Sequence, residues 1–272
     1  MEKGNTSRLS KFYTLIILVL LYIAIISFPF TLLVADIYSK IIDMVLKIVF
    51  IIVAFISIKR YELNGVKALP DKNPFLFLLI PLFALTFSNW IYIWIFKPSL
   101  VNSFDGGLFT LTIFSTLITV FCEELLFREI THNCLKEFVK QDYLRILVSS
   151  AIFALLHFVN VFSGMNITFV LAQVGYTFVL GLILGLIKEK GAGLIILTSF
   201  HFLFNLLNND LFSFLYNGDW NKEFIITNVI IGAIAVIYGV LMYFFLKVNS
   251  LPLDLKDNSE DEISDASNKE EN

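Results

Sequence analysis

Charged residues are scarce in this sequence, and a soluble fold needs more of them. Asp, Glu, Lys and Arg make up 16% of the 272 residues, whereas a soluble domain carries about 25%. Hydrophobic residues make up 57%, and 29 residues are phenylalanine. So few charges cannot cover a water-facing surface, and the composition therefore indicates an integral membrane protein.

Cysteine is also rare, and several binding motifs are missing. The two cysteines, Cys122 and Cys134, lie near the inner end of one predicted span, so no disulfide framework is expected. The sequence has no internal repeat, no glycine-rich phosphate loop and no basic patch typical of nucleic-acid binding. The lipid bilayer is therefore an expected partner, and nucleic acid is not.

Long apolar runs dominate the rest of the chain. A transmembrane helix needs about 20 mostly apolar residues, and eight runs meet this requirement. They cover residues 12–35, 38–58, 75–96, 107–127, 144–162, 167–187, 192–208 and 224–246. The expected fold is an all-α membrane protein, a polytopic bundle of about eight transmembrane helices.

The distribution of positive charge predicts how this bundle is oriented. With the N-terminus in the cytoplasm, 16 lysines and arginines fall on the cytoplasmic side and 3 on the other. Because cytoplasmic loops are enriched in these residues, both termini are expected in the cytoplasm. The chain then divides into a cytoplasmic N-terminus (1–11), a membrane domain (12–248) and a tail (249–272). This tail is strongly acidic, so we expect it to be disordered.

Two pairs of opposite charges lie inside predicted spans. Asp43 and Lys47 are four residues apart and can pair on one helix face, so we interpret them as a structural ion pair. Glu124 and Arg128 have the same spacing, with the glutamate first, which is the favourable order. Glu123 is rotated by about 100° from Glu124 and lacks that partner. It is either a free carboxylate facing the bundle interior or part of a charge cluster that ends the helix at the interface.

Two of the three histidines also fall inside predicted spans. A single histidine in a span is more often a packing residue than a catalyst. However, the predicted depths of Glu123, His157 and His201 agree within the error of the span boundaries. Phe153 shares a helix face with His157, and Asn205 shares one with His201, each at a spacing of four residues. Two imidazoles, a free carboxylate and an amide are suited to activating water and stabilising an oxyanion.

These residues resemble the three motifs of the CPBP family of intramembrane CAAX proteases and bacteriocin-processing proteins, also called the Abi family. The motif E-E-x-x-x-R occurs at 123–128, F-x-x-x-H at 153–157 and H-x-x-x-N at 201–205. Each motif alone is weak, but all three occur in order on separate predicted helices. The resemblance implies a family core over about 105–210, and the eight-span layout also resembles the prenyl-protein endopeptidases of this family.

The resemblance implies a role for each matched residue. Glu123 would be the general base that activates the hydrolytic water, with His157 assisting. His201 and Asn205 would form the side that stabilises the oxyanion. The supporting residues would be Glu124, Arg128 and Phe153.

The family has been interpreted both as zinc metalloproteases and as glutamate proteases that need no metal. A zinc ion would be held by Glu123, His157 and His201. These residues lie on three predicted helices without an H-E-x-x-H pair, so metal-independent chemistry is favoured and no cofactor is assigned. A thiol nucleophile at Cys122 is disfavoured, because an apolar packing role explains this residue.

The expected function is that of an intramembrane endopeptidase in a bacterial plasma membrane. It would hydrolyse a peptide bond of a membrane-associated peptide or lipopeptide reached from the cytoplasmic side. Nothing in these residues encodes recognition of a prenyl group. The alternative is a bacteriocin self-immunity or accessory protein that acts by binding or by proteolysis. A transporter is a third reading, but the sequence lacks repeat symmetry and paired discontinuous helices.

Overall fold

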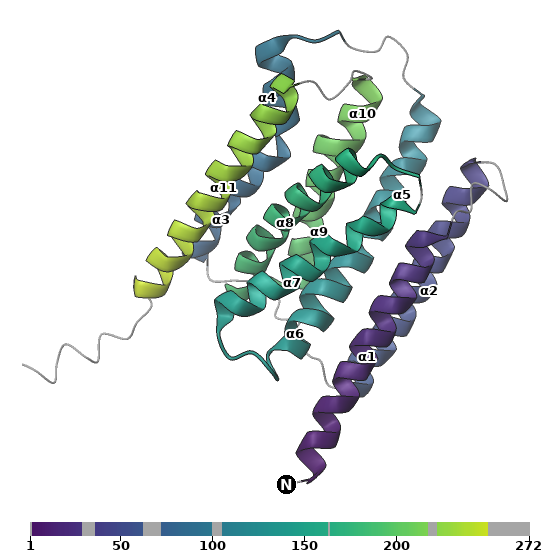
Figure 1. Ribbon diagram of the computed structural model, residues 1–272, viewed down its shortest axis with the longest axis vertical. Helices are drawn as coiled ribbons and strands as arrows, with labels where there is room; N and C mark the ends of the chain where they lie inside the picture. The colour runs from purple at the N-terminus through teal and green to yellow at the C-terminus, as the bar shows by residue number, and fades with distance from the viewer. Residues whose placement is uncertain are drawn as a thin grey trace, which may run out of the picture.

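The computed structural model describes residues 2–28, 36–61, 72–99, 105–162, 164–216 and 222–249, and all secondary structure in these ranges is helical (Figure 1). The α-helices are α1 (Glu2–Ser27), α2 (Asp36–Tyr61), α3 (Lys72–Thr86), α4 (Ser88–Phe96), α5 (Gly106–Glu124), α6 (His132–Leu135), α7 (Asp142–Leu156), α8 (Ile167–Glu189), α9 (Leu194–Phe204), α10 (Leu211–Leu215) and α11 (Lys222–Asn249). Two π-helical segments, η2 (Leu125–Thr131) and η4 (Asn205–Asp210), and the 3₁₀ segment η3 (His157–Val161) complete the fold. The predicted all-α fold is confirmed. Of the predicted disordered tail, residues 250–272 lie outside the described residues.

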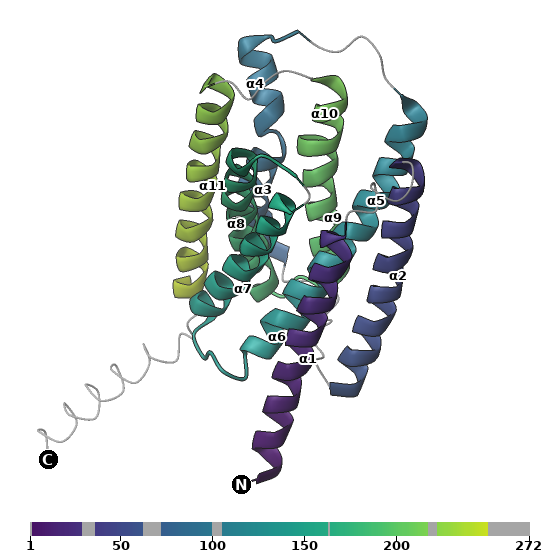
Figure 2. The ribbon, with the colours of Figure 1, turned by 45° about the vertical axis from the view of Figure 1, so that its right-hand side comes forward.

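The helices form a bundle with two flanks and a centre. Helices α1 and α2 pack side by side on one flank, and α3, α4 and α11 lie on the opposite flank (Figure 1, Figure 2). Helices α5, α7, α8 and α9 occupy the centre. The three motif-bearing segments therefore lie inside the bundle.

Fewer helices pass a length and hydropathy criterion for a membrane span than the eight predicted from the sequence. Among the described residues, six helical segments are long and apolar enough to cross a membrane: Leu9–Ser27, Ile37–Lys59, Gly106–Leu135, Asp142–Val161, Ile167–Glu189 and Glu223–Met242. The bent pair α3 and α4 adds a seventh if it counts as one span. The chain is therefore a multi-pass integral membrane protein with six or seven candidate spans. The predicted span over 192–208 is not among them, and the one over 75–96 is recovered only as the bent pair.

Polar residues account for this difference. Helix α9 ends at Phe204 after 11 residues, and η4 then brings Asn205, Asn208, Asn209 and Asp210 into the run. The apolar part is thus too short to cross a membrane unaided. Protein surrounds these groups: the Asn208 side-chain oxygen accepts a hydrogen bond from the Asn89 backbone N–H at 3.2 Å, and Asn205 and Asn209 line an internal cavity.

Helix α8 presents two glycines, four residues apart, to helix α7. A Cβ atom at Gly181 would lie 3.2 Å from the Ser150 Cα atom, and one at Gly185 would lie 2.9 Å from Ile146 Cγ2. Small residues at this spacing let two membrane helices approach each other. This contact fixes α7, which carries Phe153 and leads into His157, against α8.

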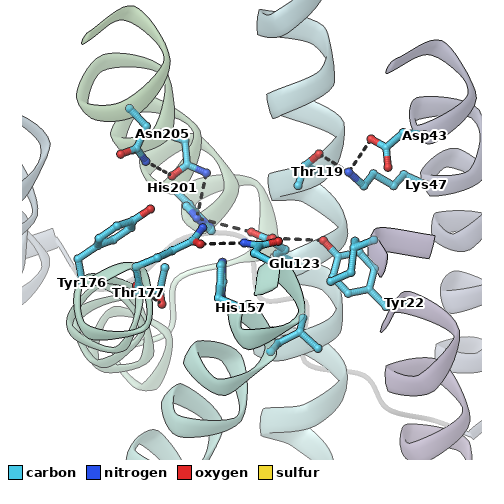
Figure 3. A pocket seen from close by; sticks show the side chains of 15 residues that line it. Tyr22, Asp43, Lys47, Thr119, Glu123, His157, Tyr176, Thr177, His201 and Asn205 are labelled. Atoms are coloured by element: carbon cyan, nitrogen blue, oxygen red, sulfur yellow. Dashed lines mark hydrogen bonds and ion pairs between the residues drawn. The ribbon is translucent and has the colours of Figure 1, made fainter. Parts of the chain in front are cut away.

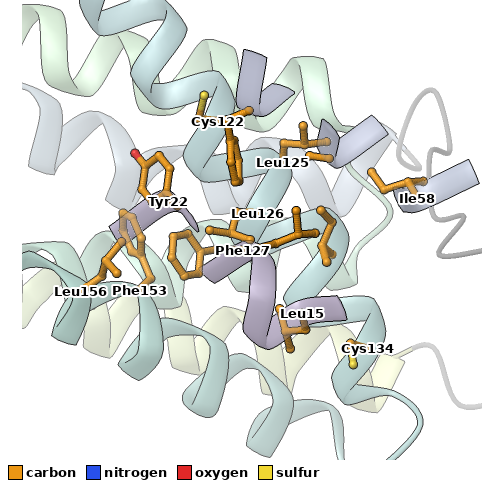
Figure 4. Close-up of a cluster of buried hydrophobic side chains, with 14 of the residues drawn as sticks. Leu15, Tyr22, Ile58, Cys122, Leu125, Leu126, Phe127, Cys134, Phe153 and Leu156 are labelled. Atoms are coloured by element: carbon orange, nitrogen blue, oxygen red, sulfur yellow. The ribbon is translucent and has the colours of Figure 1, made fainter. Parts of the chain in front are cut away.

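A buried apolar cluster joins the first flank to the centre. Its side chains come from α1, α2, α5, η2, α6, α7 and α9. They include Tyr22, Phe127 and Phe153, each fully buried (Figure 4), and Phe50. Large apolar side chains elsewhere are exposed, such as Trp94 at 78%. An apolar exterior of this kind suits a lipid-facing surface.

Candidate active site

A polar cavity of about 300 Å³ lies in the centre of the bundle (Figure 3). Glu123, His157, His201 and Asn205, the four residues predicted to be catalytic, all line it. The remaining lining residues are Tyr22, Ile26, Asp43, Lys47, Thr119, Leu156, Asn160, Gln173, Tyr176, Thr177 and Asn209. Segments from α1, α2, α5, α7, α8 and α9 thus bring distant polar groups to one place.

The two adjacent glutamates differ as predicted. Glu124 is fully buried, and its Oε2 lies 3.4 Å from Arg128 Nε, which confirms the predicted i, i+4 pair. The Arg128 guanidinium also lies over the Phe153 ring, 4.5 Å from its centroid, in a cation–π contact. Glu123 does not share this arginine and faces the cavity instead. Phe153 and Arg128 do not line the cavity themselves, but Phe153 contacts His157, which does.

Glu124 has a second partner that the sequence did not predict. His201 Nδ1 donates to Glu124 Oε1 at 2.8 Å. A carboxylate can only accept, so this bond fixes the proton on Nδ1 and the orientation of the ring. It turns His201 Nε2 toward Glu123 Oε2 at 3.7 Å and Asn205 Nδ2 at 3.4 Å. Glu124 thus orients His201, while Glu123 remains open to a ligand.

His157 is held by its own helix. Its Nδ1 donates to the Phe153 carbonyl at 3.0 Å, so Nε2 is the nitrogen left for the cavity. Phe153 makes edge contacts with both imidazoles, at ring-centroid distances of 5.1 Å to His157 and 5.7 Å to His201. The predicted placement of Phe153 against His157 is confirmed. Figure 3 shows the His157 ring beside the Glu123 carboxylate.

Each motif lies where the helix changes type. Glu124 is the last residue of α5 before the π-helical η2 begins, His157 opens the 3₁₀ segment η3, and Asn205 opens the π-helical η4. Irregular turns of this kind inside helices are frequent at functional sites, because they redirect side chains that a regular helix would stack on one face.

Several cavity residues carry no sequence signal. Tyr22, on α1, donates from its hydroxyl to Glu123 Oε1 at 3.2 Å. Asn160 Nδ2 donates to Gln173 Oε1 at 2.8 Å across the opposite wall. The predicted ion pair of Asp43 and Lys47 is confirmed at 2.7 Å, but it also lines the cavity. Periodicity could identify the ion pair, whereas nothing in the apolar run around Tyr22 marks this tyrosine.

Further charges are paired outside the cavity. His132, for which the sequence suggested no role, is buried, and its Nε2 lies 2.8 Å from Glu189 Oε1. Arg145 binds the same carboxylate oxygen at 2.9 Å, and Lys188 pairs with Glu129. These contacts tie the end of α8 to η2, α6 and α7, the elements that frame the site.

The candidate metal ligands do not fit a metal site as they are placed. Within the described ranges, no three His, Cys, Asp or Glu side chains form a group that could hold a metal ion. The Nδ1 atoms of His201 and His157 are bound to Glu124 and to the Phe153 carbonyl, so only their Nε2 atoms are left for a ligand in the cavity. Cys122 is buried, with its sulfur 3.4 Å from the Lys47 carbonyl oxygen, and does not line the cavity.

Comparison with known proteins supports the resemblance implied by the motifs. Residues 105–207 match the family described as type II CAAX prenyl endopeptidase Rce1-like. No curated protein and no solved structure matches the chain. The match covers all three motifs and gives no support to bacteriocin immunity. Residues 105–207 of this chain therefore form a domain of the Rce1-like type II CAAX prenyl endopeptidase family, the group also called CPBP or Abi.

Proposed function

We propose that this protein is an intramembrane endopeptidase that hydrolyses a peptide bond of a membrane-associated peptide or lipopeptide. The observation that carries the proposal is the shared cavity: the Glu123 carboxylate, two imidazoles and an amide line the same space of about 300 Å³. Such a set can activate water and stabilise an oxyanion. The family match of residues 105–207 supports the same reaction class.

The proposed reaction uses Glu123 as the base. Glu123 takes a proton from a water molecule that also binds His157, and the water oxygen attacks the carbonyl carbon of the scissile bond. The Asn205 amide donates to the developing oxyanion. His201 forms the same side of the site: its Nδ1 is held by Glu124, and its Nε2 accepts from Asn205 Nδ2 at 3.4 Å, which holds the amide beside the developing oxyanion. Glu123 then returns its proton to the leaving amine nitrogen as the carbon–nitrogen bond breaks.

A second cavity supports a lipid-bearing substrate. It has a volume of about 590 Å³ and is lined mainly by apolar side chains of α8, α9 and α11. Tyr176 and Asn209 line both cavities, so the two adjoin. We propose that the apolar cavity takes the hydrocarbon chain of a lipopeptide while its peptide lies beside Glu123. Cleavage of a lipidated peptide should therefore exceed cleavage of the same peptide without its lipid.

The catalytic assignment is tested with purified protein and a fluorogenic membrane-anchored peptide. Glu123→Ala and His157→Ala should each lower kcat by roughly 100- to 10,000-fold, the usual contribution of a general acid or base. Glu137→Ala is the matched control, because this partly exposed glutamate pairs with Lys11 outside the cavity. Full activity in both cavity variants would rule out the assignment.

We also propose eight membrane crossings with both termini in the cytoplasm. The start of α1 and the end of α11 lie at the same end of the bundle (Figure 1, Figure 2), which requires an even number of crossings. The segment of α9, η4 and α10, which spans Leu194–Leu215, would supply the eighth. The bias of lysine and arginine supports the cytoplasmic placement. Location in a bacterial plasma membrane stays a prediction.

A further inference from the structure

We propose that Tyr22 is a positioning residue that holds the Glu123 carboxylate ready for catalysis. The inference rests on the proposed function, because it assigns a role to a neighbour of the proposed base. Tyr22 donates its hydroxyl hydrogen bond to Glu123 Oε1 at 3.2 Å, and both residues line the central cavity. The two residues are 101 positions apart in the chain.

The tyrosine ring is fixed by its surroundings. Tyr22 has no exposed surface, and its ring packs against Phe50 of α2 with a centroid distance of 5.3 Å. Both rings belong to the apolar cluster that joins α1 and α2 to α5 and η2 (Figure 4). Because close-packed side chains have few alternative rotamers, the hydroxyl is held at one place beside Glu123.

The hydroxyl complements a second contact on the other carboxylate oxygen. Glu123 Oε2 lies 3.7 Å from His201 Nε2, so α1 and α9 approach the carboxylate from two sides. A glutamate side chain has several rotatable bonds and would otherwise sample other orientations. Holding the base near its attack geometry removes this freedom before the reaction begins.

Tyr22, which positions Glu123, lies outside the region that matches the family. Tyr22 lies on α1, whereas the match begins at residue 105. The flank formed by α1 and α2 is therefore part of the catalytic apparatus, and it is not merely a membrane anchor for the domain.

The first experiment measures the kinetics of Tyr22→Phe, which keeps the ring and removes the hydroxyl. Loss of a hydrogen bond to a charged group predicts a kcat roughly 10- to 100-fold lower with KM unchanged. Tyr92→Phe is the matched control: it removes another buried tyrosine hydroxyl, at a site that lies outside the cavity. Its kcat should equal that of the wild type. Any fall in the thermal midpoint of either variant reports a lost structural contact and is scored separately from kcat. An unchanged kcat in Tyr22→Phe, or a raised KM alone, would overturn the inference. The proposed function is tested separately, by the activity of Glu123→Ala.

A second experiment needs no turnover. A hydrophobic carbodiimide reacts with protonated carboxylic acids, and mass spectrometry reports the labelling of Glu123. Without the Tyr22 hydroxyl, the carboxylate is no longer held in one orientation and can turn toward the reagent, so labelling should become several-fold faster in Tyr22→Phe and not in Tyr92→Phe. Equal labelling rates in Tyr22→Phe and the wild type would contradict the inference even if the protein cleaves peptides. Faster labelling in a protein without peptidase activity would support the positioning and reject the proposed function.

Discussion

Glu124 illustrates, at the residue scale, which contacts a sequence can predict. Its pairing with Arg128 follows from helical spacing alone, because the two residues belong to one continuous helical run. Its hydrogen bond to His201 spans 77 positions and depends on how α5 and α9 pack. The motif spacing therefore predicted the local partner and missed the distant one.

The buried Glu124–Arg128 pair should be costly to break on one side. Arg128→Met leaves a fully buried carboxylate without its cation and removes the contact with Phe153. Removing one partner of a buried pair costs about 3–5 kcal/mol of unfolding free energy. We expect a matching loss of stability in detergent, measured by equilibrium unfolding.

The double variant Glu124→Gln/Arg128→Met provides the control for this prediction. A glutamine keeps an oxygen that can accept from His201 Nδ1 but carries no charge. The double variant should therefore be more stable than Arg128→Met alone. If the two have equal stability, the unpaired charge is not what destabilises the single variant.

At the scale of elements, the site depends on how closely α7 and α8 approach. His157 directly follows α7, and Gly181 of α8 lies against the Ser150 backbone of α7. Because the contacting atom belongs to the backbone, a side chain at Gly181 must push the helices apart. The end of α8 is also tied to η2 through Lys188 and Glu129, so such a shift would reach the glutamate-bearing segment.

Gly181→Ala should therefore lower both stability and activity. Overpacking of this kind costs typically about 1–3 kcal/mol, and displacement of His157 from Glu123 should lower kcat. Gly106→Ala, in the first turn of α5, is the control, since nothing lies within 4 Å of the added carbon and this residue lines neither cavity. This control should be neutral or slightly more stable, because alanine favours a helix over glycine. Thermal unfolding and peptide cleavage of both variants check the prediction; equal behaviour would contradict it.

At the scale of the whole molecule, the polar α9–η4–α10 segment decides the topology. A hydropathy criterion does not identify this segment as a membrane span, because η4 interrupts the apolar run with four polar residues, Asn205, Asn208, Asn209 and Asp210. In the bundle, neighbouring segments bind two of these groups: Asp210 accepts from Thr116 at 2.6 Å, and the Asn208 side-chain oxygen accepts from the Asn89 backbone N–H at 3.2 Å. Polar residues can lie within a membrane domain when protein surrounds them.

Cysteine labelling from each side of the membrane tests the eight-crossing topology. In a variant without native cysteines, Lys3→Cys and Ser259→Cys should react only from the cytoplasmic side. Ser103→Cys and Asn217→Cys should react only from the opposite side. Labelling of Ser259→Cys from the opposite side would mean an odd number of crossings and would exclude the proposed role of Leu194–Leu215.

The sequence by itself determined the membrane class, the helical fold and the residues of the three motifs. These features depend on composition and on contacts within one helix, which spacing alone encodes. Only the tertiary structure decided that Glu124 orients His201, that Tyr22 binds Glu123, and that Asp43 and Lys47 line the same cavity. The reason is physical: these contacts join different helices, and the packing of α1, α2, α5 and α9 sets which side chains meet.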